Sequence, residues 1–228
     1  MPSIRSIDSI ELHPKVTFFV GENGSGKSTL LEAIADKLGF SLQGGGRNKN
    51  PMLDGYQTEL ASYLSLRRTP NRPMDAFFLR AESYFNHASE LDELERTPFC
   101  DGALRSYGGK SLHEVSHGEA FFATLVHRLG GHGVYLFDEP EAALSPQRQL
   151  SMLVRIHDLV AEFSQFIIAT HSPLIMAYPD AFIYHFSETG IERIAYEDTE
   201  HFQVTRNFLR DPSGMTRKLL TDPEADRD

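Results

Sequence analysis

Short apolar runs recur along the chain between polar and glycine-containing segments. Residues 16–20, 134–137 and 166–169 are almost continuously apolar, and residues 75–80 carry an apolar centre. Such runs are typical of strands buried on both faces of a parallel sheet. Residues 181–186 and 191–196 flank a Ser-Glu-Thr-Gly turn, a pattern typical of a β-hairpin at a sheet edge. A looser alternation over residues 4–12 suggests one short strand before His13.

Helical spacing of apolar residues appears between these runs. It predicts helices over residues 26–39, 57–66, 83–95, 118–129 and 145–163, and two short helices over 199–220 with a break at Asp211-Pro212. Residues 43–51 are glycine-rich and polar, as in a surface loop. Strands alternating with helices predict an α/β fold with a mostly parallel central sheet, flanking helices, and a C-terminal β-hairpin followed by helices.

Length and composition favour one domain over residues 1–228. A chain of 228 residues can bury a single sizeable α/β core. No apolar stretch approaches the roughly 18 residues of a membrane span, and the N-terminus does not resemble a signal peptide. We therefore expect a cytoplasmic protein without direct membrane insertion. The single cysteine, Cys100, excludes an internal disulfide, and the net charge of −10 argues against a surface that is basic throughout.

A phosphate-binding loop follows the first predicted strand. Gly21, four further residues and Gly26-Lys27-Ser28 form the complete P-loop pattern. Glycines permit positive φ, which turns backbone N–H groups toward phosphate oxygens, and the helix that follows adds its positive end. Lys27 is expected to reach the β- and γ-phosphates, and Ser28 to bind Mg²⁺. The predicted nucleotide-binding residues of this loop are Gly21, Glu22, Asn23, Gly24, Ser25, Gly26, Lys27, Ser28 and Thr29.

Two further predicted strands end in reactive groups. Asp138 and Glu139 follow the run 134–137, and His171 follows the run 166–169. Ligands of open α/β sheets bind at the carboxyl ends of strands. An aspartate in this position suits Mg²⁺ beside a P-loop, and the adjacent glutamate suits activation of the attacking water.

These motifs together resemble those of an ABC-type P-loop ATPase, nearer the soluble SMC and RecF-like branch of AAA-family ATPases than the transporters. Residues 21–29 are similar to the Walker A motif, 134–139 to the Walker B motif with its catalytic glutamate, and 142–145 to the D-loop. His171 resembles the switch histidine, and residues 115–119 resemble the LSGGQ signature. The resemblance covers about residues 16–184.

The resemblance implies a Mg²⁺-dependent ATPase that uses ATP and Mg²⁺, with Glu139, His171 and Lys27 as catalytic residues. It also implies a homodimer in which two copies pair head to tail when ATP is bound. Ser116 and Gly118 would then contact the γ-phosphate held by the partner. A short helical lid over residues 83–117 is expected within the single domain.

Several positions depart from the family pattern. His117 replaces a glycine of the signature, Glu119 its glutamine, and Ser145 the usual aspartate of the D-loop. The glutamine that normally precedes the lid is absent, and Glu82 is the candidate to replace it near Mg²⁺. The P-loop begins by residue 21, which leaves little room upstream for an adenine-stacking aromatic, so we expect an incomplete adenine pocket.

Three functions fit the motifs to different degrees. Only about 33 residues separate Glu82 from Ser116, which disfavours a long coiled-coil arm and a transporter subunit. The preferred hypothesis is a stand-alone ATPase acting in DNA repair or defence. Whether it binds nucleic acid is left open by the sequence. The alternative is the ATP-binding subunit of an ABC transporter. A GTPase or small-molecule kinase is weaker, because Asn48-Lys49-Asn50 lacks the aspartate of a guanine-reading motif.

Overall fold

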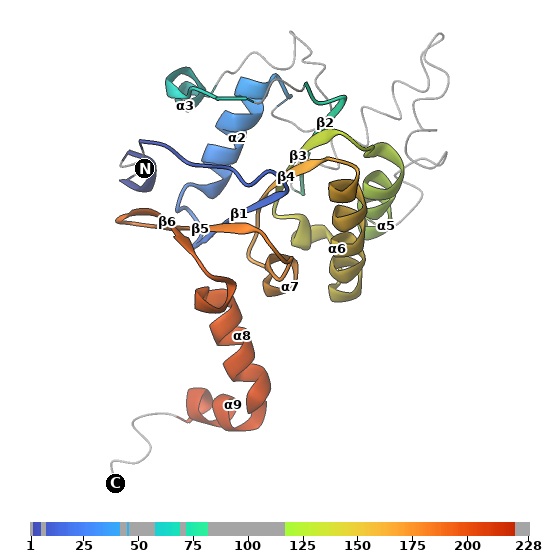
Figure 1. Ribbon diagram of the computed structural model, residues 1–228. Helices are drawn as coiled ribbons and strands as arrows, with labels where there is room; N and C mark the ends of the chain where they lie inside the picture. Colours follow the sequence, from blue (N-terminus) through green and yellow to red (C-terminus); the bar gives the residue numbers. More distant parts are fainter. Residues whose placement is uncertain are drawn as a thin grey trace.

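A six-stranded, mostly parallel sheet forms the centre of the molecule (Figure 1). The computed structural model describes residues 2–5, 8–41, 45, 58–68, 72–81 and 117–221. The strand order is β2-β3-β4-β1-β5-β6, and only the pairing of β5 with β6 is antiparallel. The strands are β1 (Val16–Gly21), β2 (Asp75–Arg80), β3 (Gly133–Asp138), β4 (Gln165–Ala169), β5 (Phe182–Ser187) and β6 (Gly190–Ile194). The predicted α/β class, parallel sheet and edge hairpin are confirmed.

Helices cover both faces of this sheet. On one face α2 (Lys27–Leu38) packs against alternate strand residues such as Phe19 and Ile167, with α3 (Glu59–Tyr63) beside it. On the other face Phe18 and Phe166 lie in a second apolar cluster with α5, α6 and α7. Their bounds are α5 (His117–Ala123), α6 (Pro146–Ala161) and α7 (Pro173–Met176). Because successive strand residues point to opposite faces, continuous apolar runs were needed to fill both layers.

Short helical turns and a C-terminal helix pair complete the described elements. These are α1 (Pro2–Arg5), the π-helix η2 (Thr124–Arg128), the 3₁₀ turns η3 (Pro140–Ala143) and η4 (Tyr196–Asp198), α8 (Glu200–Arg210) and α9 (Pro212–Leu220). Figure 1 shows α8 and α9 extending away from the sheet, and neither helix contains a buried residue. None of the described helices is long and apolar enough to cross a membrane.

The prediction of a short strand within residues 4–12 is wrong for residues 4, 5 and 8–12, which the structure describes. Residues 2–5 form α1, and residues 8–12 form neither helix nor strand. The Tyr184 hydroxyl donates to the carbonyl oxygen of Glu11 in this segment over 2.7 Å, and directly after the segment the Thr17 hydroxyl accepts from the N–H of His13 over 2.8 Å. These hydrogen bonds hold this part of the chain in place without pairing it to a β-strand.

Other predicted elements agree with the structure or lie outside it. The helices expected over 26–39, 57–66, 118–129, 145–163 and 199–220 correspond to α2, α3, α5 with η2, α6, and α8 with α9. The helix expected over 83–95 and most of the loop over 43–51 lie outside the described residues. The single domain over residues 1–228 and its lid over 83–117 remain predictions.

Candidate functional site

The loop between β1 and α2 has the backbone shape of a phosphate cradle. Gly21, Gly24 and Gly26 have φ values of 139°, 79° and 105°. A Cβ on Gly21 would lie 2.4 Å from the carbonyl oxygen of Phe186 on β5, so no larger residue fits there. Ser25 places its hydroxyl oxygen in a buried position without a hydrogen-bond partner among the described residues. The helix α2 begins immediately after this loop, so its N-terminal N–H groups face the same space.

Lys27 folds back over the loop. Its buried ammonium donates to the carbonyl oxygens of Gly21 and Glu22 over 2.8 and 2.7 Å. Burial lowers the pKa of Lys27, while the nearby carboxylates, Glu139 first among them, act to raise it. A lysine ammonium has three donors, and these two bonds use two of them.

The end of β3 meets the start of α2 through a hydrogen bond. The Ser28 hydroxyl donates to Oδ1 of Asp138 over 2.9 Å, although the two residues are 110 positions apart. The other oxygen of Asp138 lies 3.6 Å from Nε of Arg80 at the end of β2, and Nη1 of Arg80 lies 2.8 Å from Glu32 on α2.

Burial is the largest influence on the pKa of Asp138. It raises the pKa of Asp138 from 3.8 to about 6, against the hydrogen bond from Ser28 and the attraction of Arg80, which both lower it. A cation at this carboxylate would favour its charged form and offset the burial.

The Ser28 and Asp138 pair fits a magnesium ion in its chemistry. Mg²⁺ prefers hard oxygen ligands and takes few of them from the protein when phosphates supply the rest. A hydroxyl and a carboxylate oxygen adjacent to a phosphate loop are such a set. Within the described residues, no group of three or more His, Cys, Asp or Glu side chains gathers as a metal site. The ion would therefore depend on the phosphates of a bound nucleotide.

Glu139 occupies a strained position beside this pair. Its φ is 48°, in the left-handed region that non-glycine residues rarely adopt. The N–H of Glu139 donates to the carbonyl oxygen of Ala169 over 2.9 Å, which fixes the turn between β3 and η3. Strained backbone of this kind is concentrated at functional sites.

His171 follows β4 and faces Glu139. Its Nε2 atom is buried, forms no hydrogen bond within the described chain and lies 3.5 Å from Oε1 of Glu139. Burial, and next the charge of Lys27, lower the pKa of His171. The neutral ring is therefore the dominant form at neutral pH.

Glu141 holds the backbone around His171 and was not identified from the sequence. Its carboxylate accepts from the Thr170 hydroxyl over 2.8 Å and from the N–H of His171. Burial raises the pKa of Glu141. The only sequence signal was an acid two positions after Glu139. A second residue missed by the sequence is His201 of α8, whose Nε2 lies 3.0 Å from Nδ1 of His171.

Gly118 of the expected signature lies against Ala143 of the expected D-loop. Arg148 donates to the carbonyl oxygen of Gly118 over 3.3 Å, and a Cβ on Gly118 would lie 2.9 Å from the carbonyl oxygen of Ala143. Ser145 caps α6 by accepting from the N–H of Arg148 over 3.4 Å, a capping role that the usual aspartate could also fill. Ser116 and Glu82 lie outside the described residues.

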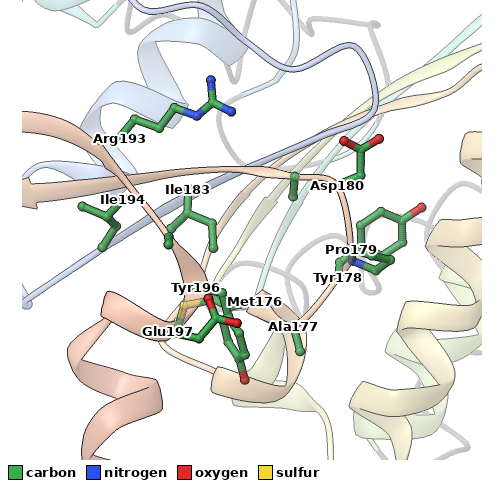
Figure 2. Close-up of a pocket in the computed structure, with 12 residues that line it drawn as sticks. Met176, Ala177, Tyr178, Pro179, Asp180, Ile183, Arg193, Ile194, Tyr196 and Glu197 are labelled. Carbon is green, nitrogen blue, oxygen red and sulfur yellow. The ribbon is translucent and has the colours of Figure 1, made fainter.

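A separate cavity of about 600 Å³ lies between α7 and the β5–β6 hairpin (Figure 2). The residues that line it include Met176 of α7, Arg193 of β6, and Tyr196 and Glu197 of η4, all labelled in Figure 2. None of the predicted site residues lines this cavity. The predicted site residues of the P-loop, Asp138, Glu139 and His171 lie instead where β1, β3 and β4 end, and these three strands are neighbours in the sheet.

Comparison with known families gives two matches. Residues 3–73 match a family described as "AAA domain". Residues 106–177 match a family described as "AAA domain, putative AbiEii toxin, Type IV TA system". The first match contains the P-loop, and the second contains Asp138, Glu139 and His171.

Individual proteins show similarity over part of their length. The hemin import ATP-binding protein HmuV of Bordetella avium is 28% identical over 175 residues, which is 68% of this chain and 65% of that protein. The chain thus spans slightly less than two thirds of this relative. The DNA replication and repair protein RecF of Colwellia psychrerythraea is 69% identical over 26 residues, 11% of this chain and 7% of that protein.

Among solved structures, cbiO1 from Clostridium perfringens, part of the ABC transporter complex cbiONQ, superposes with a TM-score of 0.48 at 20% identity. That match covers 91% of this chain and 88% of cbiO1.

Proposed function

We propose that the chain is an ABC-type P-loop ATPase that binds ATP with Mg²⁺ where β1, β3 and β4 end, and that it hydrolyses ATP there. One observation carries the proposal: the hydrogen bond of 2.9 Å from Ser28 to Asp138, which joins the phosphate loop to the carboxylate at the end of β3. Nucleotide hydrolysis at a P-loop needs these two oxygen groups side by side. Asp138 directly precedes Glu139, whose Oε1 lies 3.5 Å from Nε2 of His171.

The proposed reaction assigns one task to each side chain. The Glu139 carboxylate takes a proton from the attacking water, whose oxygen bonds to the γ-phosphorus while the bond to the β-phosphate oxygen breaks, releasing ADP and phosphate. Nε2–H of His171 donates to an oxygen of the γ-phosphate. Lys27 exchanges its carbonyl partners for phosphate oxygens. Ser28 and Asp138 would hold Mg²⁺, which would supply positive charge next to the β- and γ-phosphates.

We further propose that the active form is an ATP-dependent homodimer. Ser116 and Gly118 would act on the γ-phosphate held by a second copy, with the N-terminal end of α5 directed at it. Support comes from the start of α5, which is fixed against the turn after Glu139 by the contacts of Gly118 with Ala143 and Arg148.

The variant Glu139→Gln tests both parts of the proposal. The amide keeps the shape of the side chain but cannot take a proton, so ATP binding should persist while turnover is lost. Light scattering on this variant with ATP and Mg²⁺ should give twice the mass measured with ADP. The exposed Glu162→Gln at the end of α6 is the matched control and should hydrolyse ATP like the wild-type protein. Turnover by Glu139→Gln at the wild-type rate would exclude Glu139 as the base, and a persistent monomer would exclude the dimer.

The biological process is the remaining question, and two classes are proposed. A role in DNA repair or defence is favoured by the RecF similarity and by the family described as an AbiEii toxin. A role as the ATP-binding subunit of an importer is favoured by the longer match to the hemin import protein. A gel-shift with duplex DNA at low salt, with and without ATP, separates them, because phosphate contacts dominate such binding. An ATP-dependent shift supports the first class, and its absence favours the second.

A further inference from the structure

The root of α8 touches the candidate switch histidine. His201, in the first turn of α8, places Nε2 3.0 Å from Nδ1 of His171, and the ring centroids are 5.2 Å apart at an interplanar angle of 60°. Burial lowers the pKa of both rings, so both are mainly neutral at neutral pH. A neutral imidazole has one donor and one acceptor nitrogen. In the hydrogen bond between the rings one histidine must donate and the other accept, so the tautomers of the two rings are coupled.

The surroundings of His171 determine the direction of this bond. Its Nε2 faces Oε1 of Glu139 at 3.5 Å, and an ionised carboxylate only accepts. The proton of His171 is therefore most stable on Nε2, which leaves Nδ1 as an acceptor. His201 can satisfy this acceptor only by donating from its own Nε2.

We propose that His201 is a positioning residue, whose Nε2–H donates to Nδ1 of His171 and holds that ring in the tautomer that presents Nε2–H to Glu139 and the γ-phosphate. The inference rests on the proposed function of the site, because His171 needs a proton on Nε2 only if it contacts phosphate. Histidines that bind a ligand through one nitrogen commonly have their tautomer fixed through the other.

Hydrogen bonds at the N-terminal end of α8 hold it in place, so that His201 is kept beside His171. Thr199 is buried, caps α8 by accepting from the N–H of Phe202 over 3.3 Å, and donates to the carbonyl oxygen of Tyr196 over 2.7 Å. The Tyr196 hydroxyl donates over 2.9 Å to the carbonyl oxygen of Pro173, two residues after His171. Two contacts thus join the base of α8 to the segment that carries the switch histidine.

The rest of α8 and all of α9 project from the body (Figure 1). Val204, Phe208 and Leu209 are all exposed on α8, and His201 and Phe202 near its first turn are half-buried. A displacement of this helix would move His201 relative to His171. The proposed contact therefore makes α8 a part of the molecule whose position affects the ATPase site.

Two substitutions separate the donor from the bulk of the side chain. His201→Leu keeps an apolar side chain of comparable size but removes the donor. His201→Gln keeps an N–H donor near the position of Nε2 and should act as the conservative rescue. His127→Gln is the matched control, because His127 is exposed on η2.

Ring tautomers are measured on the nucleotide-free protein. A two-bond ¹H–¹⁵N correlation spectrum of histidine-labelled protein distinguishes Nε2–H from Nδ1–H rings, and a His171→Gln variant assigns the His171 signals. We expect His171 in the Nε2–H form in the wild-type, His201→Gln and His127→Gln proteins, and a shift toward Nδ1–H in His201→Leu. An unchanged Nε2–H signal in His201→Leu overturns the proposal.

Kinetics give the second readout. We expect kcat of His201→Leu to fall about tenfold or more with KM for ATP nearly unchanged, because loss of an orienting partner typically costs about 10–100-fold. His201→Gln should recover most of the rate. Wild-type kcat in His201→Leu overturns the positioning role even if the tautomer shifts. A wild-type protein that does not hydrolyse ATP contradicts the proposed function instead, and the tautomer measurement then decides on the contact alone.

Discussion

Replacing Asp138 by asparagine should stabilise the protein when nucleotide and metal are absent. The carboxyl is buried, with 8% of its side chain exposed, and its pKa is raised from 3.8 to about 6. A carboxyl with a higher pKa in the folded state binds its proton more tightly there. The free energy of unfolding therefore falls as pH rises through this interval and stays low above it. A shift of about two pKa units corresponds to about 3 kcal/mol.

Asparagine carries no charge and still offers an oxygen to the Ser28 hydroxyl. Asp138→Asn should therefore exceed the wild-type protein in stability by up to about 3 kcal/mol at pH 8, and by roughly half of that at pH 5. For a chain of this size, about 2–4 °C per kcal/mol converts the gain at pH 8 to ~6–12 °C in Tm. Thermal unfolding followed by circular dichroism at both pH values, with EDTA present, measures both gains.

The matched control is Asp158→Asn, which removes an exposed carboxylate from α6. Surface substitutions of this kind usually change stability by no more than about 0.5 kcal/mol. A gain for Asp138→Asn that is absent at pH 8, or that is no larger at pH 8 than at pH 5, would refute the reasoning from burial. The same variant should lose Mg²⁺-dependent ATP binding, since the stabilising change removes the charge that the ion needs.

Three other substitutions test separate parts of the site. Lys27→Ala should reduce ATP affinity to background in a calorimetric titration, and wild-type affinity would exclude the P-loop as the binding site. Gly21→Ala should lower Tm by several degrees, because its Cβ would lie 2.4 Å from the carbonyl oxygen of Phe186 and φ is 139°; an unchanged Tm would contradict this packing. Glu141→Gln should lower kcat more than ATP affinity, because it weakens the support of the His171 backbone, and equal losses would argue for a binding role.

The parts of the site that follow directly from local sequence could be predicted. A glycine-rich P-loop pattern and an acidic residue directly after an apolar run can each be recognised within a few consecutive residues. The parallel arrangement then brings the strand ends to one edge. This reasoning located the P-loop, Asp138, Glu139 and His171 at a common edge of the sheet.

Residues that act through distant contacts could not be predicted in this way. His201 and His171 are 30 positions apart, and nothing near His201 in the sequence indicates that the base of α8 returns to the end of β4. The ion pairs of Arg80 with Glu32 and Asp138 likewise join residues that are far apart in the sequence. The suggested strand over residues 4–12 failed for a similar reason, since side chains from elsewhere hold that segment.

A crystal structure with Mg²⁺ and a non-hydrolysable ATP analogue tests the central claim most directly. The account predicts that the triphosphate lies in the loop from Gly21 to Ser28, with Mg²⁺ bound by Ser28 and Asp138 and the γ-phosphate facing Glu139 and His171. An analogue bound elsewhere, for instance in the cavity between α7 and the β5–β6 hairpin, would contradict the account. So would a structure in which Asp138, Glu139 and His171 point away from the triphosphate.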